Sequence, residues 1–137
     1  MNQYKVNFMA YLEANGIIYE DIGENALVIT YNASNINVIR VVVQFEEDNA
    51  NYATFHAFGL CKMEDEQRFA RSVMICNEMN KAYRWVKFYM DDDRDLTISA
   101  DAVIDLETVG EECLEIVLRI CQIGDKALPE FFKARWA

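Results

Sequence analysis

The only histidine in the chain, His56, is the residue best suited to act as a general base. It stands between Phe55 and Ala57, in a segment whose residue types are typical of a β-strand. Catalytic triads assemble in space, so spacing along the chain leaves a serine or cysteine partner open. No nucleophile motif accompanies the histidine, however. We therefore interpret His56 as a structural or solvent-facing side chain and predict no catalytic residue.

An acidic run offers the nearest approach to a metal site. Asp91, Asp93 and Asp95 have the alternate spacing of the first three ligands of a calcium loop. Leu96 stands where that loop needs glycine, and Ala102 stands where a glutamate should close the ligand shell. The run therefore favours a charged hairpin turn over a calcium site. One histidine and scattered cysteines also lack the minimum ligand set for zinc, so we predict no metal and no cofactor.

The cysteines are interpreted as reduced, buried side chains. None of them has the C-x-x-C spacing of redox or zinc motifs, and free thiols in apolar segments pack as small hydrophobic groups. The four are Cys61, Cys76, Cys113 and Cys121. This usage favours a reducing compartment and hence a cytoplasmic location.

Two asparagines share a predicted helix face with apolar residues. Asn77 and Asn80 lie at helical spacing from Phe69, Val73 and Cys76. A buried amide without hydrogen bonds costs about 1 to 3 kcal/mol, so amides on such a face need partners. We predict that the pair ties its helix to neighbouring backbone or to a sheet edge. Contact with a small ligand is the alternative.

The aromatic residues near the end of the chain, with two more on the strands, exceed what one small core obviously needs. Exposed together, they would form a surface for a partner or a second copy, whereas packed inward they would be ordinary core. The residues assigned to partner binding on this basis are Tyr52, Phe58, Phe131, Phe132 and Trp136.

Hydrophobic periodicity predicts the elements that position these residues. Apolar side chains recur at helical spacing over about 3–15 and over 65–82. Runs of β-branched and aromatic residues, bounded by polar or glycine-containing turns, predict strands. The predicted strands are 17–22, 26–31, 36–45, 52–60, 85–90 and 96–104.

A third helix is predicted after these strands. Thr108 and Glu111 match a capping box, and the apolar helix should continue through Ile123. Pro129 suits the first turn of a separate short helix over 131–136, because proline lacks the amide hydrogen that a helix interior uses. We predict one α+β domain over residues 1–137. Its antiparallel sheet of about five strands carries helices mainly on one face, in the order α-βββ-α-ββ-α.

The amino-acid composition is typical of an acidic globular protein. The chain has 137 residues, 53% of them apolar, and a net charge of −10. Nucleic-acid affinity depends on lysine and arginine contacts to phosphate, so nucleic-acid binding is not predicted. No segment approaches the roughly 18 apolar residues of a membrane span, and no membrane association is predicted either.

From the second predicted helix onward, the sequence resembles the YbjN family, described as bacterial sensory transduction regulators. The resemblance is carried by Cys76-Asn77-Glu78-Met79-Asn80, by 85–90, by the acidic turn and by 96–104. Members of this family look like class I type III secretion chaperones in fold, which implies a homodimer that binds protein. The family has no established catalytic residues, and the resemblance makes Asn77 and Asn80 structural positions. One departure is that turn 91–95 lacks the glycine such hairpins often use.

Together these observations predict a non-enzymatic, cytoplasmic adaptor, chaperone-like or regulatory protein of bacterial signalling. It would bind a protein partner through its sheet face or terminal helices and would form a homodimer. The alternative is a small-molecule sensor or a cryptic enzyme, with a pocket near His56 or between a helix and the sheet.

Overall fold

The computed structural model describes residues 2–35 and 38–137 of the chain. Within these residues, three helices and six strands form an α+β fold, which confirms the predicted fold class. The elements are α1 (Gln3–Ala14), β1 (Glu20–Asp21), β2 (Ala26–Asn32), β3 (Val38–Phe45), β4 (Tyr52–Ala57), α2 (Glu66–Ala82), β5 (Lys87–Met90), β6 (Leu96–Val103) and α3 (Val109–Trp136).

The six strands make one antiparallel sheet with the spatial order β1-β2-β3-β4-β6-β5. Strand β6 pairs with both β4 and β5, so the β5–β6 hairpin that follows α2 extends the sheet beyond β4 and leaves β5 at the edge. Alternation places Ile39, Val41 and Val43 on the buried face of β3, while Arg40 and Gln44 point to the opposite, exposed face. The sheet therefore has one apolar face to cover.

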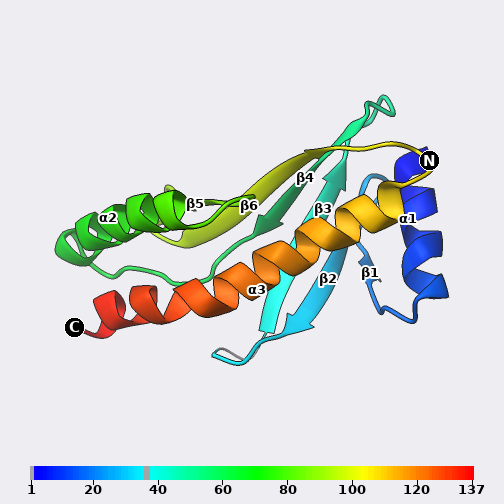
Figure 1. Cartoon of the computed structure of the whole chain (residues 1–137). Helices are drawn as coiled ribbons and strands as arrows, with labels where there is room; N and C mark the ends of the chain where they lie inside the picture. The colour runs from blue at the N-terminus through cyan, green and yellow to red at the C-terminus, as the bar shows by residue number, and fades with distance from the viewer. Residues whose placement is uncertain (1, 36–37) are drawn as a thin grey trace.

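Helix α3 covers that face by running diagonally across it (Figure 1). Helix α1 packs against the beginning of α3, and α2 lies beside β5 and the end of α3. The close approach of α3 to the sheet is set at Gly124, where an added Cβ would lie 3.1 Å from Ile98 Cδ1. In the described part of the chain, no helix combines the length and apolarity that crossing a bilayer requires.

The first predicted strand is much shorter in the structure than predicted. In place of a strand over 17–22, only Glu20–Asp21 pairs, with Val28 and Leu27 of β2. At the end of this short strand, the buried ammonium group of Lys5 donates to Asp21 Oδ1 at 2.6 Å and also to the Gly23 carbonyl. The sheet has six strands instead of about five, and residues 36–37 of the predicted third strand lie outside the described residues.

The predicted break in the last helix is also wrong, because α3 continues through Pro129 to Trp136. Proline cannot donate to the carbonyl four residues earlier, which here belongs to Asp125. That carbonyl instead accepts a hydrogen bond of 2.8 Å from Asn35 Nδ2, in the loop between β2 and β3. A loop amide thus replaces the missing helix hydrogen bond.

The predicted capping box does not form at the start of α3. The Thr108 side chain makes no capping hydrogen bond within the described structure. The carboxylate that reaches back across the helix start belongs to Glu112, whose Oε1 accepts from the Asp105 amide at 2.9 Å. The helix begins where predicted, at Val109, but a different acidic residue secures the entering chain.

Three aspartates make the fold sensitive to acid. The Lys5 side chain lowers the pKa of Asp21, the Arg68 backbone amide lowers that of Asp65, and the Asn35 and Ser34 amides lower that of Asp125. A lowered pKa means that folding favours the charged carboxylate. This stabilisation is therefore complete above the ordinary value of 3.8 and is lost as the pH falls below it.

We expect the free energy of unfolding, measured by urea titration, to fall as the pH drops below the ordinary carboxyl value of 3.8. Asp21→Asn should make this fall shallower, because one of the three responsible carboxylates is gone. Asp92→Asn, at an exposed turn position, is the matched control and should keep the wild-type slope. Identical slopes for wild type and Asp21→Asn would contradict the assignment.

Candidate functional site

An exposed apolar surface lies where the end of α3 meets the sheet. We call it the tail surface and define it by Val38, Phe58, Phe132 and Trp136. Phe58 is 56% exposed and Trp136 is 74% exposed, whereas Phe132 is half-buried between them. Large apolar side chains exposed side by side are uncommon on a monomer and mark interaction sites.

Two hollows adjoin at Phe132. One has a volume of about 290 Å³ and lies between Phe132 and the residues Val38, Arg40, Phe58 and Leu60. The other has a volume of about 440 Å³ and is lined by Asn35, Pro129, Phe132, Lys133 and Trp136. Because the same phenylalanine borders both hollows, they form one continuous, mostly apolar surface with Phe132 as its ridge.

Phe131 does not belong to this surface, so its assignment to partner binding is wrong. It is fully buried, and its ring stacks on Phe88 with centroids 6.1 Å apart. Neighbouring residues of a helix point about 100° apart, so Phe131 enters the core while Phe132 points outward. Tyr52 is exposed but begins β4, about 20 Å from Phe58 at the far end of that strand, and it lies opposite Val103.

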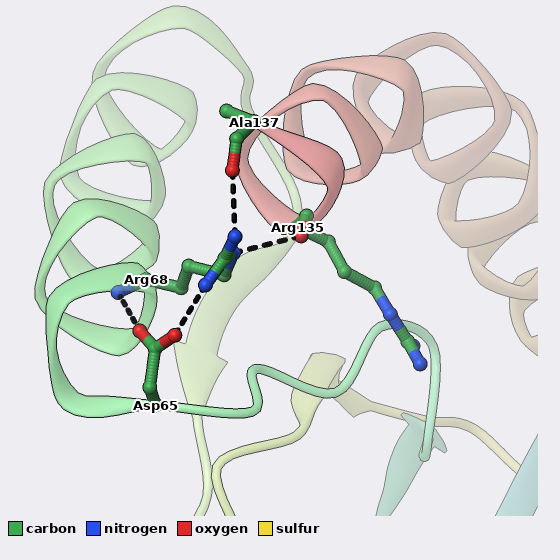
Figure 2. Close-up of polar contacts among 4 residues, drawn as sticks. All are labelled: Asp65, Arg68, Arg135 and Ala137. Carbon is green, nitrogen blue, oxygen red and sulfur yellow. Dashed lines mark hydrogen bonds and ion pairs between the residues drawn. The ribbon is translucent and has the colours of Figure 1, made fainter.

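An arginine on α2 holds the end of α3, as Figure 2 shows. Arg68 Nε donates to the carbonyl of Arg135 at 2.9 Å, and Arg68 Nη2 donates to the carbonyl of Ala137 at 2.7 Å. The guanidinium group also pairs with Asp65, the residue that caps the start of α2. Carbonyls at a helix end have no partner within the helix, so this contact secures the last turn that carries Trp136.

The positive charges around the tail surface each have an acidic neighbour. Ion pairs join Arg40 to Glu20 at 3.4 Å, Lys133 to Glu130 at 3.2 Å and Arg135 to Glu64 at 3.4 Å. The Arg135 guanidinium also lies 5.0 Å from the centre of the Trp136 ring. The surface is therefore close to neutral, and its apolar residues dominate its binding properties.

His56 lies on the exposed face of the sheet with its ring stacked on Phe58 at 4.9 Å. Its cross-strand neighbour is Ser99, and Asp101 is close enough to affect its pKa, which burial lowers overall. The three residue types of a hydrolase triad thus share one sheet face. Among the described residues, however, no hydrogen bond joins His56 to either neighbour, so the relay that a triad requires is absent.

The asparagines differ in their surroundings, and the premise that both are buried is wrong. Asn80 is also exposed, yet its side-chain amide makes two hydrogen bonds to the edge strand β5. Its Nδ2 donates to the Phe88 carbonyl at 3.0 Å, and its Oδ1 accepts from the Phe88 amide at 2.8 Å. Asn77 is exposed, and its side chain makes no hydrogen bond within the described residues. Asn80 thereby occupies polar backbone groups that would otherwise be open to another strand.

The acidic run forms the predicted hairpin turn between β5 and β6. Asp91 Oδ1 accepts from the amides of Asp93 and Asp95, and Asp95 Oδ1 accepts from the amide of Cys61 at 3.1 Å. Arg94 takes the left-handed conformation, with φ of 62°, that glycine would adopt at low cost. Within residues 2–35 and 38–137, no group of three or more His, Cys, Asp or Glu side chains is placed to hold a metal ion.

All four cysteines are free and buried. Burial raises the pKa of Cys76 to about 11 and the pKa values of Cys113 and Cys121 to about 12. It raises the pKa of Cys61 as well. The thiolate is the reactive form of cysteine, so these side chains are suited to packing and unsuited to nucleophilic chemistry.

Comparison with known proteins assigns the chain to a family. A family model described as "YbjN: Putative bacterial sensory transduction regulator" matches residues 6–132. The chain belongs to the YbjN family. Among solved structures it is similar to "Crystal structure of YbjN, a putative transcription regulator from E. coli". The TM-score is 0.63 at 12% identity, with 92% of each chain covered, and the likeness at this identity concerns the fold. No curated protein matches the sequence.

This YbjN-family chain also has a hollow of about 330 Å³ between α2 and β5, where the alternative interpretation expects a small-molecule pocket. Apolar side chains make up most of its lining, and its polar groups are the two asparagine amides and the Tyr89 hydroxyl. The Asn80 amide is already occupied by Phe88, which leaves Asn77 and the Tyr89 hydroxyl to bind a ligand. Small-molecule sites combine several converging polar groups, and this hollow offers few.

Two groups of exposed apolar residues in this YbjN-family chain were not predicted from the sequence. Lining residues such as Val38 and Pro129 carry no signal, because their exposure depends on where α3 ends against the sheet. The exposed apolar residues of α2, Val73 and Met74, were assigned to a core face or left unassigned. A helical wheel centred on buried Cys76 would have placed Met74 on the opposite, solvent side.

Proposed function

We propose that this protein is a non-enzymatic, cytoplasmic regulator that acts by binding another protein at the tail surface. The observation that carries the proposal is the pair of adjoining hollows on either side of Phe132. Protein interfaces draw most of their binding energy from a few apolar or aromatic anchors in preformed pockets. A ridge between two apolar hollows is suited to such anchors.

The rigidity of the tail surface supports the proposal. Arg68 holds the last turn of α3 from the side of α2, and Asn35 holds the helix at Asp125 from the loop between β2 and β3. The part of α3 that lines the hollows is therefore held at two points, one before Phe132 and one at the end of the helix. A surface ordered before binding loses less conformational entropy when the partner arrives.

The chemistry of the surface defines the expected partner. Apolar lining residues and charges paired with one another favour a protein segment that inserts two apolar side chains, one on each side of Phe132. Nucleic acid is disfavoured, because phosphate contacts need available cations and the chain has a net charge of −10. The family description as a regulator agrees with a binding role.

An affinity purification from the native cytoplasm tests the proposal. Tagged wild type, Phe132→Ala, Trp136→Ala and Trp85→Ala proteins would be compared by quantitative mass spectrometry. Trp85 is the matched control, because it is also exposed and also lies 5.0 Å from an arginine, Arg119, on a different surface. We expect a stoichiometric partner to be recovered with wild type and Trp85→Ala, and to fall at least about tenfold with the two tail variants.

Two results would contradict the proposal. One is equal recovery of every associated protein with all four samples. The other is loss of the partner from Trp85→Ala alone, which would move the binding surface to Trp85, between α2 and β5 and beside Arg119 of α3. Circular dichroism of each variant should match wild type, since the substituted side chains are exposed or half-buried.

A further inference from the structure

A group of polar side chains lies on the exposed face of the sheet, where β4, β6 and β5 are neighbours. The side chain of Ile98 contacts α3, so Thr97 and Ser99 on either side of it point to the opposite face. Cross-strand pairing places His56 and Lys87 on either side of Ser99. We define the exposed-face cluster as His56, Lys87, Thr97, Ser99 and Asp101.

The polar groups of this cluster lack partners within the protein. In the part of the chain that the structure describes, neither Lys87 nor Asp101 takes part in an ion pair. Thr97 is fully buried and Ser99 is only 4% exposed, and Thr97 Oγ1 makes no hydrogen bond among the described residues. A buried hydroxyl without a hydrogen bond costs free energy, so Thr97 gains from a ligand atom that accepts its proton.

Aromatic rings border the cluster on both sides. The His56 ring stacks on Phe58 at 4.9 Å with the two planes 3° apart, and Tyr89 lies opposite Thr97 on β5. Lys87 Nζ lies 6.0 Å from the centre of the Tyr89 ring. These larger side chains shield the small residues of β6, and the ring of Phe58 is exposed enough to rotate and uncover them. Small-molecule sites combine aromatic surface with several converging polar groups, as this cluster does.

The charges of the cluster define its ligand. Lys87 lies opposite Ser99, and Asp101 follows two residues further along β6, about 7 Å away. Burial lowers the pKa of His56 from its ordinary value of 6.5, so the imidazole is neutral at pH 7 and adds no charge. One cation and one anion therefore flank the Ser99 hydroxyl. A ligand that matches them carries a negative and a positive group close together, beside a planar ring for the aromatic border.

We propose that the exposed-face cluster binds a free aromatic α-amino acid. Its carboxylate pairs with Lys87 and accepts hydrogen bonds from the Thr97 and Ser99 hydroxyls. Its ammonium group pairs with Asp101, and its ring packs on Phe58. Because Phe58 also borders the tail surface, the bound ring lies next to the proposed site of the protein partner.

A titration with L-phenylalanine tests the proposal, with amide chemical shifts of β4, β5 and β6 as the readout. Three analogues each lack one group of the ligand. The compound 3-phenylpropionate lacks the ammonium group, phenethylamine lacks the carboxylate, and glycine lacks the ring. We expect L-phenylalanine to bind at least about threefold more tightly than each analogue, which is the scale of one exposed charge contact.

Variants of the two charged residues assign each ligand group to its partner. Lys87→Met should weaken L-phenylalanine and 3-phenylpropionate at least about threefold and leave phenethylamine unchanged. Asp101→Asn should weaken L-phenylalanine and phenethylamine and leave 3-phenylpropionate unchanged. Both side chains are exposed, so neither change disturbs the core. Thr97→Val, which keeps the shape of the side chain, should behave as Lys87→Met does.

Lys126→Met is the matched control, because it removes the same charge from an exposed position on α3 and should keep wild-type affinity. The proposal is overturned if L-phenylalanine causes no saturable shift on these strands up to its solubility limit. It is also overturned if the charged-residue variants weaken all three aromatic compounds equally. Ligand binding here needs no protein partner, so its failure and the failure of partner binding at the tail surface are distinguishable.

Discussion

Replacing Phe131 with alanine is expected to lower the free energy of unfolding by about 3 to 5 kcal/mol. The ring is fully buried and stacks on Phe88, beneath the end of α3. Its removal exchanges a packed aromatic contact for a cavity that neighbouring side chains fill only in part. This is the largest effect expected from a single truncation near the tail surface.

Phe132 provides an unusually close control, because it is the adjacent residue and has the same side chain. It is half-buried and faces the two hollows, so Phe132→Ala should lower the free energy of unfolding by roughly 1 kcal/mol. Urea unfolding followed by circular dichroism measures both variants. Equal losses for the two phenylalanines would contradict the inward and outward assignments on which the tail surface depends.

Gly110→Ala is expected to destabilise the protein by about 3 kcal/mol, through the contact between α1 and α3. A Cβ added at Gly110 would lie 2.5 Å from Tyr11 Cβ and even closer to the Tyr11 ring. Tyr11 Cβ is attached directly to the α1 backbone, so rotation of the side chain cannot relieve this contact. The whole helix α1 must move away from α3.

Gly124→Ala in the same helix tests whether the effect comes from this contact or from glycine itself. An added Cβ there meets Ile98 Cδ1 at 3.1 Å and Ile39 Cδ1 at 3.4 Å, which are the ends of flexible side chains. Alanine is also the better helix former by about 1 kcal/mol, so the net change should stay within about 1 kcal/mol. Amide hydrogen exchange should show lost protection across α1 in Gly110→Ala only. Unchanged α1 protection in that variant would contradict the proposed clash.

The sequence contained enough local information to predict most elements of the fold. The alternation of Ile39, Val41 and Val43 and the helical spacing around Cys76 are direct consequences of strand and helix geometry. The continuous helix through Pro129 could not be predicted in this way. Its missing hydrogen bond is replaced by Asn35, ninety residues distant in sequence from the carbonyl that it serves.

The candidate site also combines features that the sequence predicts with features that depend on tertiary packing. Phe132 and Trp136 could be proposed from the abundance of aromatic residues, and both lie on the tail surface. Phe131 could not be separated from Phe132 without knowing that one helix spans both residues and which of its faces meets Phe88. Tyr52 and Phe58 belong to one strand region, but its length places them at opposite ends. Residue type indicated the kind of surface, and tertiary packing determined its members.

Site-directed photo-crosslinking in cells shows whether another protein contacts the tail surface. A photoreactive phenylalanine derivative would replace Trp136 in one variant and Trp85 in a matched control, both at exposed positions. Protein binding at the tail surface predicts a discrete crosslink from position 136 to another protein, at a segment with apolar side chains, and no such product from position 85. Equal products from the two positions, or no crosslinked protein from position 136, would contradict protein binding at the tail surface.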